Sequence, residues 1–238
     1  MLFKEAIVAE FNKNHDKLGR FASSGGSGKV LDMGQQSPKK IDAYMQKHYD
    51  DKDKISFHDK RSLNDYVLNT SLISNKDLRA SSAKAAKDKV KDIRNNDPDA
   101  FNDMYLLDNA THLSKLVEPT MLYRGIYSGE SFKLKVGSKI VDYGYGSTSM
   151  SEEVAKKFAD FDLNDPTKKR YIMKITAPKG TPGVAASVVA PYHAAIGNVE
   201  AEWLLPRGSA TTITKIVDKV NYIEVQGELS FSKVEKSW

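Results

Sequence analysis

The 238-residue sequence contains no cysteine, which excludes disulfide bonds and thiolate metal sites. Histidine is also scarce, and its five copies lie apart without the spacing of a metal site, at His15, His48, His58, His112 and His193. We therefore expect no bound metal. The absence of cysteine also makes a cytoplasmic or particle-borne protein the default expectation.

No apolar run is long enough to cross a bilayer. The most apolar stretch, residues 183–197, is interrupted by Pro191 and His193 and is shorter than the ~20 residues that a membrane helix needs. The first ten residues include Glu5 and Glu10 and have no apolar core of the kind that a secretory signal requires. We expect no membrane partner and no Sec signal.

The formal charge of +5 is too evenly distributed to indicate nucleic-acid binding. Residues 1–119 hold 20 Lys and Arg against 18 Asp and Glu, and residues 120–238 hold 16 against 13. Interleaved charges of both signs are typical of a solvated surface. We expect no specific nucleic-acid partner.

Breaker residues divide the chain into a tail and one folded domain. Residues 22–37 are rich in Gly, Ser and Gln, which predicts a flexible linker and makes residues 1–37 a tail. Residues 38–119 show apolar spacing typical of helices, and residues 120–238 show the shorter alternation of strands. Helices followed by strands predict an α+β fold, with a helical lobe and then a β core within residues 38–238.

Three short motifs carry most of the chemical information: Tyr123-Arg124-Gly125, Ser147-Thr148-Ser149 and Glu200-Ala201-Glu202. Each lies in a stretch that reads as a strand. If residues 200–205 form one strand, Glu200 and Glu202 project from the same face and Ala201 from the other. Taken alone, the acidic pair is typical of a solvated strand and the arginine of a structural ion pair.

The Ser-Thr-Ser motif precedes an amphipathic run that predicts a helix at residues 152–159. Ser149 or Ser151 would cap this helix, with Glu152 completing a capping box to Ser149. Capping does not account for Ser147. Nor does it account for the glycines at 144 and 146, which allow a backbone or a ligand to approach closely.

With these motifs in this order, the chain resembles the arginine-specific, toxin-like mono-ADP-ribosyltransferases, which carry an Arg, a Ser-Thr-Ser and a Glu-x-Glu. The likeness covers roughly residues 62–230. It includes the context of the last motif, Glu-x-Glu-x-Leu-Leu-Pro-Arg-Gly, at residues 200–208. The resemblance implies a helical lobe, a mostly antiparallel two-sheet core and a cleft between them for the co-substrate NAD.

The resemblance also implies roles for the motif residues. Arg124 would bind the NAD phosphates and the Gly125 backbone would hold the nicotinamide amide, while Glu202 would be the catalytic glutamate at the nicotinamide ribose. Ser147 would orient Glu202. Thr148 and Ser149 would shape the nicotinamide pocket.

The second glutamate bears on the acceptor. Glu200 would receive and deprotonate the substrate group, and within the family a glutamate at this position favours arginine of a target protein over asparagine. Tyr192, in the preceding loop, would contact the target, although packing on its own loop is an equal alternative.

Four further residues are candidates to line the NAD cleft, and two of them, Tyr66 and Asn75, resemble positions that do so in toxin-like relatives. Tyr66 and Asn75 would do so from the helical lobe, with core packing and helix capping as the alternatives. Phe161 and Arg170, in or beside the loop after the helix at 152–159, would contact nicotinamide and phosphate, with a surface location as the alternative.

Other functions stay open on the sequence. An NAD glycohydrolase, or a transferase to RNA ends or another non-arginine acceptor, would use the same motifs. Residues 11–23 resemble a segment of Mu-type phage minor head proteins, which implies phage capsid or portal partners and a virion-associated enzyme delivered into the host cytoplasm. An inactive structural or interaction protein of a phage head is the alternative. A glycosidase is disfavoured, because Glu200 and Glu202 on one strand would not flank a sugar from opposite sides.

Overall fold

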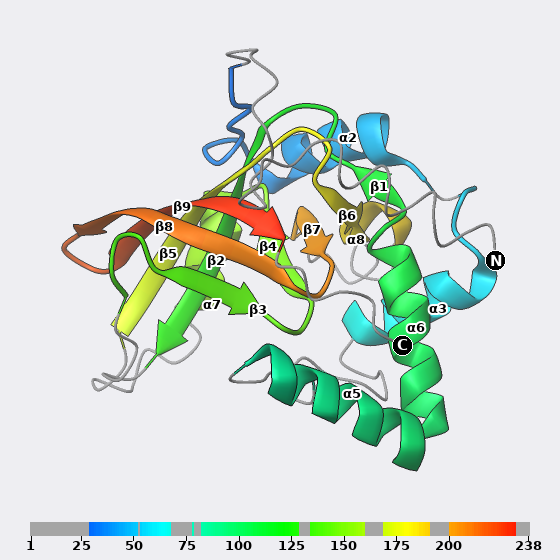
Figure 1. Cartoon of the computed structure of the whole chain (residues 1–238). Helices are drawn as coiled ribbons and strands as arrows, with labels where there is room; N and C mark the ends of the chain where they lie inside the picture. Colours follow the sequence, from blue (N-terminus) through cyan, green and yellow to red (C-terminus); the bar gives the residue numbers. More distant parts are fainter. Residues whose placement is uncertain are drawn as a thin grey trace.

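Helices come first in the chain and strands follow, which confirms the α+β prediction (Figure 1). The computed structural model describes residues 29–51, 53–67, 78, 82–128, 134–159, 169–190 and 200–231. Within these residues the helical lobe consists of α2 (Pro38–Tyr49), α3 (Phe57–Val67), α5 (Ala83–Asn96) and α6 (Pro98–Ala110). Two short helices follow among the strands, α7 (Glu152–Ala159) and α8 (Ala186–Val189).

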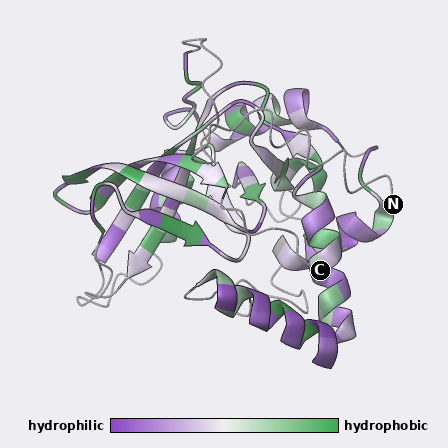
Figure 2. Cartoon of the chain, viewed as in Figure 1, coloured by the Kyte–Doolittle hydropathy of each residue, from purple (hydrophilic) through white to green (hydrophobic). Residues whose placement is uncertain are grey.

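Local sequence signals set the helix boundaries. The helices α2 and α6 both begin with proline, whose missing N–H and fixed φ suit the first helical position. Asp97 caps α6 by accepting a hydrogen bond from the Ala100 N–H at 3.0 Å. The helix α5 is mostly hydrophilic along its length, as Figure 2 shows, and buries only Ala86 among its residues. It is therefore a solvated outer helix of the lobe.

In the described part of the chain, the strands form one nine-stranded sheet in the order β1-β6-β7-β4-β2-β5-β9-β8-β3. All neighbouring strands are antiparallel except β5 and β9. The strands are β1 (Ser114–Lys115), β2 (Thr120–Ser128), β3 (Lys139–Asp142), β4 (Gly146–Ser149), β5 (Lys169–Ala177), β6 (Pro182–Ala185), β7 (Glu202–Leu205), β8 (Ser209–Asp218) and β9 (Ile223–Phe231).

The sheet has two parts that meet at a single residue pair. β2 and β4 are paired only at Tyr123 and Ser149, whereas β2 and β5 pair along nine positions. The expected two-sheet core is thus one sheet divided at this weak junction. Arg124 lies on β2 and Ser147 lies on β4, so the first two motifs are on the two strands that meet at this junction.

Two apolar clusters hold the sheet and the lobe together. The larger lies under α2 and the central strands, and in it the rings of Tyr49 and Trp203 meet edge to face with centroids 4.8 Å apart. The smaller packs Leu63, Met104 and Leu107 of the helical lobe against residues beside β4, β6 and β7. Trp203 adjoins Glu202 in the chain, so core packing anchors the third motif.

Part of the expected linker is packed on the core. Leu31 forms a parallel bridge with Thr120 at the start of β2, and Asp32 accepts a 2.6 Å hydrogen bond from the Tyr123 hydroxyl. Gln35 donates to Glu152 at 2.9 Å. The predicted tail boundary at residue 37 must therefore move to before Leu31. Residues 11–23 lie outside the described residues.

None of the helices in the described part of the chain is long and apolar enough to cross a membrane.

Candidate active site

The three motifs line one cleft of about 930 Å³. Arg124 and Gly125 reach it from β2, Ser147 from β4, Glu202 from the start of β7, and Glu200 from the segment just before β7. Residues separated by up to 78 positions in the chain thus surround one space. This convergence is what the three motifs required if they were to act together.

Glu202 and Ser147 form the best-defined polar contact in the cleft. The Ser147 hydroxyl donates a 2.7 Å hydrogen bond to Oε1 of Glu202, whose residue is only 8% exposed. The antiparallel register pairs Ser147 with Leu204, so Ser147 and Glu202 are diagonal neighbours on one face of the sheet. This hydrogen bond fixes the orientation of the Glu202 carboxylate in the cleft.

Glu200 reaches the cleft by a different route from the one expected. β7 begins at Glu202, and Ala201 before it has a positive φ of 47°, so residues 200–202 do not follow the alternation of a strand. Ala201 is fully buried, and its carbonyl accepts the Met150 N–H at 3.1 Å. The prediction of a strand from residue 200 was wrong, although both glutamates line the same cleft.

The other two hydroxyls of the Ser-Thr-Ser motif hold the neighbouring chain. Thr148 donates to the Trp203 carbonyl at 2.5 Å, and Ser149 donates to the Glu200 carbonyl at 2.6 Å. The Ser149 hydroxyl also accepts the Ser151 N–H. These bonds tie β4 to the residues around Glu202. The motif therefore fixes the position of both glutamates.

The expected capping box is wrong, because Glu152 points elsewhere. Ser151 caps α7 by accepting the Val154 N–H. The Glu152 carboxylate instead contacts the ammonium groups of Lys156 at 2.9 Å and Lys174 at 3.2 Å. Burial opposes its charge, but hydrogen bonds to these lysines prevail and lower the pKa of Glu152. Glu152 thus anchors the first turn of α7 to β5.

Arg124 faces an acidic partner that sequence reasoning missed. Its guanidinium forms a partly buried ion pair with Asp142 at the end of β3, and both residues line the cleft. β2 and β3 are not neighbours in the sheet, so the curvature of the sheet must bring the two side chains together. The ion pair holds the guanidinium, a group with five N–H donors, in the cleft.

The sequence model of the ADP-ribosyltransferase exoenzymes matches residues 41–232, which span the helical lobe and nearly all of the sheet. The chain belongs to this family. NAD is the co-substrate from which such enzymes transfer ADP-ribose. A search of curated proteins finds no match.

Solved structures of ADP-ribosyltransferases share the fold at low sequence identity. The toxin Plx2a from Paenibacillus larvae is 21% identical, with a TM-score of 0.64 over 84% of this chain and 99% of Plx2a. The Vis toxin from Vibrio splendidus is 20% identical, with a TM-score of 0.62 over 89% of this chain and 92% of Vis. The C3 exoenzyme of Clostridium limosum is 19% identical, with a TM-score of 0.60 over 85% of this chain and 98% of the exoenzyme.

Gly125 lets α7 of this ADP-ribosyltransferase lie directly on β2. A Cβ at this position would lie 1.8 Å from the Ala155 carbonyl oxygen and 2.7 Å from the Ala159 nitrogen. We expect Gly125→Ala to lower the free energy of unfolding by about 3 kcal/mol, because backbone atoms cannot yield as a flexible side chain would. Urea denaturation measures this change.

Gly137→Ala is the matched control for this prediction. Gly137 has a φ of +84°, but nothing lies within 4 Å of an added Cβ, so only backbone strain of about 1 kcal/mol is expected. Equal losses for the two variants would show that α7 does not depend on contact with Gly125.

Two exposed aromatic side chains of the ADP-ribosyltransferase line the cleft without having been predicted to do so. Phe158 on α7 is 44% exposed and Tyr127 on β2 is 39% exposed. From the sequence, Phe158 was assigned only to the end of the helix after the Ser-Thr-Ser motif. Because its side chain is exposed, it presents a planar face to a ligand ring. The predicted aromatic contact, Phe161, lies outside the described residues.

The weaker predictions have different outcomes. Tyr66 does not line the cleft, since its ring packs edge to face on Tyr145 with centroids 5.4 Å apart. Arg170 on β5 lines a smaller cavity of about 300 Å³ with Lys156 and Tyr222. Two further predicted contacts lie outside the described residues, Asn75 and Tyr192.

Within the described ranges, no group of three or more His, Asp or Glu side chains could hold a metal ion.

Proposed function

We propose that this enzyme transfers a single ADP-ribose from NAD to arginine side chains of a target protein. The observation that carries the proposal is the hydrogen bond from Ser147 to the buried carboxylate of Glu202, with Glu200 on the same cleft two residues earlier. Family membership supports transfer of ADP-ribose, and the glutamate at position 200 supports arginine as the acceptor.

Glu202 is assigned to the bond that breaks. Departure of nicotinamide takes the electron pair of the glycosidic bond and leaves positive charge on the ribose ring. A fixed carboxylate at the ribose 2′-hydroxyl stabilises this charge more in the transition state than in bound NAD. The hydrogen bond from Ser147 fixes the orientation of this carboxylate, so it meets the ribose without reorientation.

Arg124 is assigned to the NAD phosphates. A guanidinium presents several N–H donors in one plane and suits the oxygens of a pyrophosphate. Gly125 is the next residue of β2 and also lines the cleft, so its backbone is assigned to the nicotinamide amide. Thr148 and Ser149 line the adjoining wall, and Phe158 offers its ring face to the nicotinamide.

Glu200 is assigned to the acceptor. An arginine guanidinium is cationic and becomes nucleophilic only after it is oriented and loses a proton. Glu200 attracts the cation, and its carboxylate takes that proton as the guanidinium nitrogen bonds to the ribose carbon. The structural neighbour Vis has been solved with agmatine, which carries the same guanidinium group.

The test of this function uses NAD labelled on its adenylate part, with agmatine and a bacterial lysate as acceptors. We expect labelled ADP-ribosyl-agmatine and ADP-ribose on arginine of protein bands, identified by mass spectrometry. Label found only as free ADP-ribose would make the enzyme an NAD glycohydrolase. Label on RNA or on another side chain would reject arginine as the acceptor.

Residues 11–23 and their resemblance to phage head proteins stay a separate prediction. The proposed transfer reaction uses only residues of the folded part, so it does not depend on association with a particle.

A further inference from the structure

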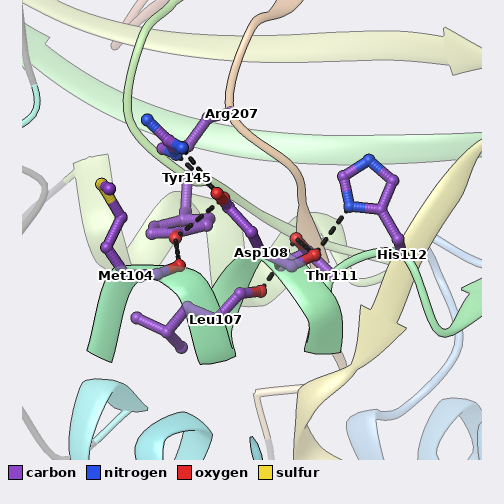
Figure 3. Close-up of polar contacts among 7 residues, drawn as sticks. All are labelled: Met104, Leu107, Asp108, Thr111, His112, Tyr145 and Arg207. Carbon is purple, nitrogen blue, oxygen red and sulfur yellow. Dashed lines mark hydrogen bonds and ion pairs between the residues drawn. The ribbon is translucent and has the colours of Figure 1, made fainter. Parts of the chain in front are cut away.

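Arg207, in the stretch that follows the third motif, does not line the cleft and has no role in the chemistry above. Its guanidinium donates two hydrogen bonds to the carboxylate of Asp108 on α6, from Nε to Oδ1 at 2.9 Å and from Nη2 to Oδ2 at 2.6 Å. The side chains of Arg207 and Asp108 are 11% and 9% exposed. Figure 3 shows this two-pronged contact between the turn after β7 and the helical lobe.

The same carboxylate also holds the residue before β4. Tyr145 donates its hydroxyl hydrogen toward Oδ1 of Asp108 at 3.1 Å and toward the Met104 carbonyl at 2.9 Å, as Figure 3 shows. The guanidinium of Arg207 lies 6.0 Å from the centre of the Tyr145 ring. One acidic group on α6 therefore contacts the chain at the ends of both β4 and β7.

Those two strand ends lie next to the proposed catalytic pair. β4 and β7 are antiparallel, and Gly146 pairs with Leu205 at the end that Asp108 holds. The adjacent pair is Ser147 and Leu204, and Glu202 lies two residues before Leu204 on β7. A shift of either strand end would change the distance between the Ser147 hydroxyl and Glu202.

We propose that Asp108 is a positioning residue: its carboxylate fixes the spacing of β4 and β7 and so sets the hydrogen bond between Ser147 and Glu202. The inference rests on the proposed function of that pair. A buried ion pair is weak as a source of stability, because desolvation of both charges offsets their attraction. Its two-pronged geometry does, however, admit only a narrow range of positions.

The electrostatics of the cluster favour a protonated Arg207 guanidinium and a protonated Tyr145 hydroxyl. Burial opposes the charge of Arg207, but the hydrogen bonds and charge of Asp108 prevail and raise the pKa of the guanidinium. Burial, together with the Asp108 charge, raises the pKa of the Tyr145 hydroxyl well above its usual value. Tyr145 therefore stays a hydrogen-bond donor, and Arg207 stays protonated.

The first test is Asp108→Asn, measured as nicotinamide release from NAD with agmatine present. We expect kcat to fall about 30-fold, because displacement of a catalytic group by a fraction of an ångström has effects of this order. The KM for NAD should change less than about twofold, since Arg124 comes from β2, which Asp108 does not touch. Arg207→Lys keeps the charge, loses the two-pronged contact and should give the same pattern.

Asp103→Asn is the matched control on the same helix. Asp103 accepts a 2.9 Å hydrogen bond from Ser62 of α3 and so joins two helices of the lobe. We expect this variant to melt at a lower temperature and to keep the kcat of the wild type. A purely structural role for Asp108 would make Asp108→Asn behave in the same way.

The decisive measurement places Asp108→Asn in a Ser147→Ala background. If Asp108 acts through the Ser147 hydroxyl, its replacement should cost less than about threefold in kcat once that hydroxyl is gone. If the losses in kcat of the two single variants multiply in the double variant, the inference is overturned. If Ser147→Ala alone releases nicotinamide as fast as the wild type, the proposed function of the pair fails instead, so the two failures are distinguishable.

Discussion

Replacement of Glu202 by glutamine should slow nicotinamide release from NAD by about 10³-fold. The amide has nearly the same shape and can still accept the hydrogen bond from Ser147. It carries no negative charge, so it cannot stabilise the positive ribose of the transition state. Chromatographic measurement of nicotinamide gives the rate, and calorimetry should show the Kd for NAD within about threefold of the wild type.

Glu228→Gln is the control for the same change of charge. Glu228 is exposed on β9 and does not line the cleft. This variant should release nicotinamide at the rate of the wild type. A Glu202→Gln enzyme with undiminished activity would remove Glu202 from the reaction and with it the assigned role of Ser147.

Replacement of Glu200 by glutamine should separate transfer from hydrolysis. We expect transfer to agmatine to fall at least about 100-fold, because the variant has no base for the guanidinium proton and no charge to attract the cation. Hydrolysis of NAD by water should change less than about threefold, since Glu202 and its bond from Ser147 remain. The two products are separated by mass spectrometry after incubation with NAD and agmatine.

The ratio of the two products decides the assignment of Glu200. If Glu200→Gln slows transfer and hydrolysis equally, Glu200 contributes to the cleavage of NAD and not to the choice of acceptor. If neither rate changes, the acceptor binds away from Glu200. Either result would leave arginine specificity without support from this residue.

The sequence located the cleft because the chemistry restricts the residue types. An arginine, a serine and a glutamate that must meet one dinucleotide cannot vary freely, so their order along the chain is informative. Strand periodicity also agrees with the structure where the apolar residues Tyr171, Met173 and Ile175 alternate, since all three lie on β5 (Lys169–Ala177) and are buried. Local side-chain alternation carries that information.

The geometry of Glu200 could not be predicted from local sequence. It depends on the positive φ of Ala201, and alanine gives no signal for such a conformation. The conformation goes with a contact from outside the segment, the Met150 N–H on the Ala201 carbonyl. A tertiary contact of this kind overrides the alternation that predicted a strand from residue 200.

Asp142 and the segment before α2 were missed for a related reason. Asp142 meets Arg124 only because the sheet curves, and no local pattern records that curvature. Gly34 was assigned to a flexible linker from composition. In the structure a Cβ at Gly34 would lie 2.3 Å from the Tyr123 hydroxyl oxygen, so this glycine permits close packing on β2.

A crystal structure of the protein with NAD would test the proposed reaction most directly. We predict the nicotinamide ribose 2′-hydroxyl within hydrogen-bond distance of the Glu202 carboxylate, with the pyrophosphate on the Arg124 guanidinium. Ser147 should keep its bond to Glu202 in that complex. NAD bound outside the cleft, or bound there with its ribose turned away from Glu202, would contradict the proposed mechanism.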